Sequence, residues 1–193
     1  MTTEPEPSGQ PEENDTTATQ RLDARLAGHR RSIATREATI NTLLEQIPAE
    51  HRSIVNEMRR IAQATGRRFG IFFCATALSS AGLPHEQIEQ VLSQFGELDT
   101  SESTIDRRLN KSVIILKNYA TNTGIKRAME LIGRIPEANR PTADQIRQFE
   151  MLAGRDGAEL SLATILRDMG IPDDQTENFF KWLFEERQRE KGL

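Results

Sequence analysis

The chain has 193 residues, 28% of them charged, and a net charge of −4, which excludes a uniformly basic nucleic-acid coat. No stretch reaches about 18 uninterrupted apolar residues, so no membrane span is expected. The one cysteine, Cys74, lies in an apolar run and excludes an intramolecular disulfide, which favours a reducing, cytoplasmic location.

Residues 1–18 hold five acidic side chains and no basic one, among Pro, Gly, Ser and Thr. Such a composition cannot bury enough apolar surface to fold, so these residues are predicted to form a disordered acidic tail. The remaining charge is uneven, with 17 basic and 12 acidic residues at 19–135 but 8 basic and 12 acidic residues at 136–193. Positive charge is therefore concentrated in the middle of an acidic chain.

The segment 43–98 recurs without a gap 88 positions later, at 131–186. The two copies share 15 identical residues in 56 positions, where ordinary residue usage would give about three or four. The identical pairs include Leu43 with Leu131, Ile47 with Ile135, Arg59 with Arg147, Gly66 with Gly154, Gly82 with Gly170 and Pro84 with Pro172. A tandem duplication explains this pattern most simply.

After the tail the pattern is helical, with Pro and Gly as punctuation. Four helices are predicted per copy: at 19–46 and 101–132, at 49–65 and 137–153, at 70–81 and 158–169, and from Pro84 and Pro172 onward. A break near Gly124 is left open. The second helix of each copy is expected to end at Gly66 or Gly154, because glycine readily supplies the left-handed residue after a helix. The predicted fold is all-α, about eight helices in two tandem four-helix units, 19–98 and 99–193.

The arginine pattern carries the most suggestive chemistry. The first copy places Arg59, Arg60, Arg67 and Arg68 in and after one helix, whereas the second copy has Gln148 and Asp156 in place of Arg60 and Arg68. Guanidinium groups suit phosphate because their planar donor fork engages two oxygens. Arg30 and Arg31 extend this basic character to the outer face of the helix at 19–46. The alternative is that the arginines pair with carboxylates or cap carbonyl groups between helices.

Residues 85–117 admit a helix-turn-helix interpretation, in which 101–109 begin a recognition helix that carries Arg107 and Arg108. The turn at 96–100 is longer than the usual three or four residues, and the segment crosses the boundary between the two copies. An ordinary connection between the copies is therefore the competing interpretation.

Two apolar patterns are candidates for partner binding. Leu26, Ile33, Ile40 and Ile47 follow a seven-residue spacing, so the helix at 22–47 either supports a homo-oligomer or packs on its own chain. Near the C-terminus, Phe179 and Trp182 lie on a different helix face from Phe180, Leu183 and Phe184. One of these two faces could bind a protein partner if it is exposed.

No pattern indicates catalysis, a cofactor or a metal ion. His29, His51 and His85 are scattered, lack the spacing of a metal site and are expected at the surface. The segment from Ala64 to Gly70 has two glycines but lacks the Lys-Ser/Thr pair of a nucleotide-binding loop. An enzyme is therefore not predicted.

Three functions remain. The sequence favours a non-catalytic protein that binds DNA or RNA through the arginines of its first unit and a protein partner through its acidic second unit. The alternatives are a helical adaptor or assembly subunit that does not bind nucleic acid, and a helix-turn-helix transcriptional regulator. The charge gradient and the arginines gained by one copy favour the first, because sequence offers no packing explanation for them.

Overall fold

The computed structural model describes residues 11–95 and 113–190, and these residues form six α-helices. The helices are α1 (Pro11–Glu45), α2 (Arg52–Ser80), α3 (His85–Gln94), α5 (Val113–Ile132), α6 (Arg140–Asp168) and α7 (Asp173–Glu190). Single 3-10 turns, η1 (Ala49–His51) and η3 (Glu137–Asn139), precede α2 and α6. The predicted all-α class is confirmed for the described residues. None of these helices is both long and apolar enough to cross a membrane.

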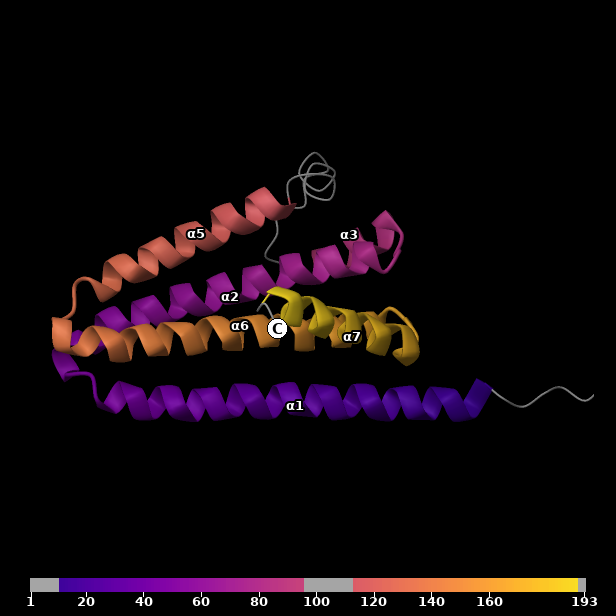
Figure 1. Ribbon diagram of the computed structural model, residues 1–193, viewed down its shortest axis with the longest axis horizontal. Coiled ribbons are helices and arrows are strands. Elements are labelled where there is room, and N and C mark those ends of the chain that lie inside the picture. Colours follow the sequence, from indigo (N-terminus) through magenta and orange to yellow (C-terminus); the bar gives the residue numbers. More distant parts are fainter. Residues whose placement is uncertain (1–10, 96–112, 191–193) are drawn as a thin grey trace, which may run out of the picture.

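The four long helices lie side by side in the order α5, α2, α6, α1 (Figure 1). α2 and α6 are the central pair and run in the same direction, while α3 and α7 lie at the end of the layer where α2 and α6 finish. Each outer helix packs on the central helix of the other sequence copy: α1 packs on α6, and α5 packs on α2. The two copies are therefore interleaved in space.

The central helices approach most closely at two glycines. A Cβ atom on Gly66 would overlap the main-chain oxygen of Met151, and one on Gly154 would overlap that of Gln63. These two contacts are equivalent under the 88-residue repeat. Neither glycine has a positive φ, so both remain helical. The predicted helix ends at these glycines are therefore wrong, because the missing side chains serve the crossing of α2 and α6 instead of a helix end.

The corners after α2 and α6 do end at glycines, as predicted. Gly82 has φ 80° and Gly170 has φ 74°, a left-handed conformation that glycine adopts without strain. The amide of the next residue reaches back to a carbonyl five positions earlier, from Leu83 to Leu78 at 3.1 Å and from Ile171 to Leu166 at 2.9 Å. This is the Schellman ending of a helix. It turns the chain into α3 or α7.

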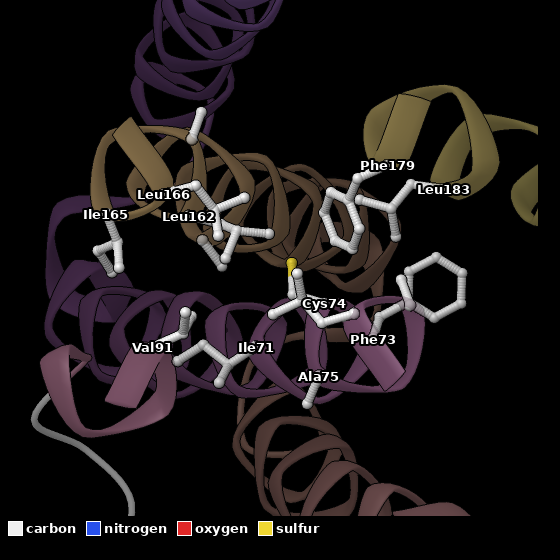
Figure 2. Packing of buried hydrophobic residues seen from close by; sticks show 14 of the residues in the cluster. Ile71, Phe73, Cys74, Ala75, Val91, Leu162, Ile165, Leu166, Phe179 and Leu183 are labelled. Carbon is white, nitrogen blue, oxygen red and sulfur yellow. The ribbon is translucent and has the colours of Figure 1, made fainter. Parts of the chain in front are cut away.

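Two apolar clusters hold the layer together, and both copies contribute to each of them. One cluster joins the first halves of α2 and α6 to α1 and α5 and includes Ile40, Val55, Met58, Ala128 and Ile146. The other lies at the end that carries α3 and α7. Figure 2 shows Leu162 and Leu166 of α6 near Ile71 and Cys74 of α2, with Phe179 and Leu183 of α7 beside them. Among the described residues, neither copy has a core of its own.

Several predicted boundaries differ from the structure. α1 already begins at Pro11, so the last part of the predicted tail, 11–18, is helical and Ala18 is buried. α2 and α6 each replace two predicted helices, so the described residues form six helices and do not confirm the predicted eight in two four-helix units. α5 continues through Gly124 because that residue packs closely against Thr65. The boundary at 98/99 and residues 96–112 of the predicted helix-turn-helix segment 85–117, which include its turn and the start of its recognition helix, lie outside the described residues.

Candidate functional site: a charged helix seat and an uncharged corner groove

α1 contacts α6 and α7 through a row of ion pairs, and we call this contact the α1 seat. The carboxylate of Glu177 on α7 lies 3.3 Å from the guanidinium group of Arg25 and 3.9 Å from that of Arg21. Farther along α1, Arg36 hydrogen-bonds to Asp156 of α6. Both carboxylates are buried. The acidic second copy thus neutralises basic residues of α1 within the molecule, where burial limits screening by salt.

Arg167 adds a further bridge at the end of α6. Its guanidinium contacts Asp23 of α1 at 2.7 Å and Asp173 of α7 at 2.9 Å. The hydrogen bond from Arg167 holds the pKa of Asp173 below its ordinary value, with a smaller contribution from the hydroxyl of Thr19. The same carboxylates, led by Asp173, raise the pKa of Arg167. This residue fixes both α1 and α7 to α6.

The arginine difference between the two copies follows from this seat. Asp156, which pairs with Arg36, corresponds to Arg68 in the first copy, and the same offset of 88 residues, extended upstream of the repeated segment, relates Arg36 to Gly124. At the matching α5–α2 contact, Gly124 lies so close to Thr65 that a Cβ atom would overlap the hydroxyl. At these two places, α1 therefore meets α6 through an ion pair, whereas α5 meets α2 through close approach of the helices. At the α5–α2 contact, Gly124 and not an arginine takes the place of Arg36, so an acidic residue is not required at position 68.

The predicted nucleic-acid residues do not form one open cluster. Arg59 donates to the buried Glu150 of α6 at 2.6 Å, and the guanidinium of Arg67 lies 5.9 Å from the centroid of the Phe95 ring. Arg60 is exposed and lines a cleft of about 360 Å³ together with Arg59 and acidic Glu37. Arg68 is exposed on α2, and Arg30 and Arg31 are exposed on α1. Arg107 and Arg108 lie outside the described residues.

One polar cluster was missed by the sequence reasoning. His29, expected at the surface, has a side chain that is only 18% exposed and lies 3.8 Å from Glu159 of α6. His29, Asp156 and Glu159 are near enough to share a cation. Arg36 and Arg155 already place positive charge beside Asp156, so the cluster belongs to the α1 seat. Its sequence signal is that buried Glu159 occupies the position of apolar Ile71 in the first copy.

The predicted partner-binding residues are mostly internal. Ile40 and Phe179 are buried in the two apolar clusters, and Ile33 is half-buried on α1. Both side chains are buried because apolar residues pack where helices meet, although Phe179 also forms part of the wall of the groove described next. Trp182 is half-buried and its ring lies 6.4 Å from that of Phe73. Trp182 also lines the groove described next.

A groove of about 550 Å³ lies between the corner after α2 and the corner after α6. Its apolar walls are formed by Leu78, Leu83, Leu166, Ile171, Phe179 and Trp182. Its polar groups are Gln87, Gln175, Thr176 and Asn178. None of its lining residues is charged, in a chain that is 28% charged. We call this surface the corner groove. Its volume lies in the range of about 300–1,000 Å³ that binding pockets occupy.

No family model, curated protein or solved structure matched the chain.

Proposed function

We propose that this chain is a non-catalytic helical scaffold that binds another protein, and that the corner groove receives one helix of that partner. The inserted face of the partner helix is apolar and uncharged. This proposal is carried by the corner groove, the uncharged concave surface defined above. Helices that dock into such grooves do so through apolar residues spaced three and four positions apart.

The ion pairs of the α1 seat support this choice over nucleic-acid binding. The charge gradient along the sequence favoured phosphate as the ligand because no packing explanation was known. The pairs of α1 with Asp156 and Glu177 now supply such an explanation. Arg59 is similarly paired with Glu150. An uncharged groove also disfavours a phosphate backbone, whose binding depends on basic contacts.

Introducing charge into the groove tests this function. Gln87→Lys and Gln175→Lys each place an ammonium group in the corner groove without changing its apolar walls. We expect these variants to bind the purified partner at least about tenfold more weakly, because the apolar helix face would have to desolvate the charge. The partner is first captured with the wild-type chain, and its affinity is then measured by isothermal titration calorimetry.

Gln90→Lys is the matched control, since Gln90 is exposed on α3 and does not line the groove. It should bind the partner like the wild-type chain. Equal affinities of the groove variants and this control would rule out the corner groove as the docking site.

Nucleic-acid binding remains a second candidate because Arg30, Arg31, Arg60 and Arg68 are exposed and take part in none of the ion pairs described above. If they bind phosphate, replacing all four by Gln should abolish binding to mixed-sequence DNA or RNA. Wild-type affinity should also fall steeply between about 50 and 200 mM salt. Fluorescence anisotropy measures both effects, with Lys181→Gln as a charge control. Undetectable wild-type binding at low salt would remove this candidate.

A further inference from the structure

The hydroxyl of Thr176 lacks the hydrogen bond that six other threonine hydroxyls make within the described helices. Thr35, Thr39, Thr42, Thr65, Thr76 and Thr164 each donate to the carbonyl oxygen four residues earlier, at 2.6–3.2 Å. Thr176 is fully buried, and its Oγ1 has no hydrogen-bond partner among the described residues. A buried hydroxyl without a partner is destabilising.

The equivalent position in the first copy shows that the fold does not require this hydroxyl. Thr176 corresponds to Ile88, which is buried in the same apolar cluster as the α7 side chains. An aliphatic side chain therefore satisfies the packing at this corner of the fold. The second copy carries a polar group there although packing alone favours an apolar one.

Thr176 also lines the corner groove. Threonine in a helix populates two χ1 rotamers, so its hydroxyl can turn from the helix toward the groove when an acceptor arrives there. The amide side chains of Gln175 and Asn178 lie on the same helix and line the same groove. The groove thus combines apolar walls with neutral hydrogen-bonding groups, and Thr176 is the one whose hydroxyl is buried and unpartnered.

We propose that Thr176 is a specificity-determining residue of the corner groove, which selects an apolar group that carries a neutral hydrogen-bond acceptor, such as a carbonyl oxygen. This inference rests on the proposed function, because it assigns the chemistry of the partner atom that enters the groove. An acceptor placed beside the hydroxyl removes the unpartnered state, whereas a purely aliphatic group leaves it unchanged.

Indane and 1-indanone test this role because they share one ring skeleton and differ by a carbonyl group. Their affinities for the full chain are measured by NMR, following the indole N–H signal of Trp182, the only tryptophan. Thr176→Val keeps the shape of the side chain and removes the hydroxyl. We expect the preference for 1-indanone over indane to fall about fivefold in this variant, the size of one net hydrogen bond. Thr176→Ile, which copies the residue at position 88, should behave in the same way.

Thr164→Val serves as the control, because the hydroxyl of Thr164 is exposed and already donates to Leu160. It should leave the preference unchanged. If both probes bind but Thr176→Val keeps the wild-type preference, the proposed role of Thr176 is wrong, while the corner groove is retained as the docking site. If neither probe moves the Trp182 signal of the wild-type chain, the groove does not bind such groups and the proposed function loses its main support as well.

Discussion

Asp156 and Arg68 occupy equivalent positions of the repeat and carry opposite charges, and their surroundings explain the difference. Asp156 is buried where Arg36 reaches it, whereas Arg68 is exposed beside a contact made by Gly124. A buried carboxylate is stable only when it is paired, so Arg36 and Asp156 depend on each other. The charge at these two positions therefore depends on contacts between the copies, and such contacts cannot be inferred from the residues one at a time.

The pair of Asp173 and Arg167 gives a pH-dependent prediction at this scale. Because the pKa of Asp173 is lowered in the folded chain, its stabilisation is complete well above the unfolded value of about 3.9 and is lost as the pH falls through the folded value. Asp173→Asn should lower the free energy of unfolding by about 1 kcal/mol near neutral pH. This difference from wild type should shrink between about pH 5 and pH 3. Urea unfolding at several pH values measures it.

Asp174→Asn is the control, because Asp174 is the exposed neighbour in the same first turn and takes part in none of the Arg167 contacts. The same pH-dependent loss in both variants would show that Arg167 is not its cause.

α2 and α6 each continue through a glycine, because Gly66 and Gly154 allow the two helices to approach closely where they cross. Sequence alone suggests a helix end at Gly66 and Gly154, since glycine is common there. The same residue type also allows two backbones to approach closely, and only the neighbouring helix distinguishes the two uses. Gly82 and Gly170, by contrast, were predictable because a proline follows each of them two residues later.

This crossing predicts opposite effects for the same substitution at two places. Gly66→Ala should destabilise the chain by about 2 kcal/mol, because the added methyl group meets the backbone of Met151 and the helices must separate. Gly157→Ala on α6 meets open space and should stabilise the chain by about 0.5–1 kcal/mol through helix propensity. Thermal and urea unfolding measure both. A stabilising Gly66→Ala would contradict the close crossing.

At the scale of the molecule, the two sequence copies share their cores. α1 lies on α6 and α5 lies on α2, and both apolar clusters combine side chains from the two copies. A copy on its own would expose the faces that these contacts bury, and such exposed apolar area is unfavourable. The division into units at 19–98 and 99–193 describes the sequence repeat, whereas the packing crosses it.

Separate expression of residues 1–98 and 99–193 tests this arrangement. Neither fragment alone should unfold cooperatively, because each lacks half of both apolar clusters. An equimolar mixture should regain helical circular dichroism and a cooperative transition. Cooperative unfolding of either fragment alone, at the wild-type midpoint, would show that a single copy is a self-sufficient domain.

The amino-acid sequence alone predicts the helical class and the two glycine corners, because these follow from local periodicity and backbone preference. Its self-similarity also shows the 88-residue repeat. It also identified Trp182, Ile33, Ile40 and Phe179 as candidates for partner binding, and left open whether they pack in the core; Ile40 and Phe179 are buried. The packing of the helices reveals what the sequence could not: α1 and α5 each pack on a central helix of the other copy, Arg59 and Arg36 are paired, and an uncharged groove lies between the corners. Such contacts join residues about 90 to 120 positions apart, a distance at which no local pattern constrains which side chains meet.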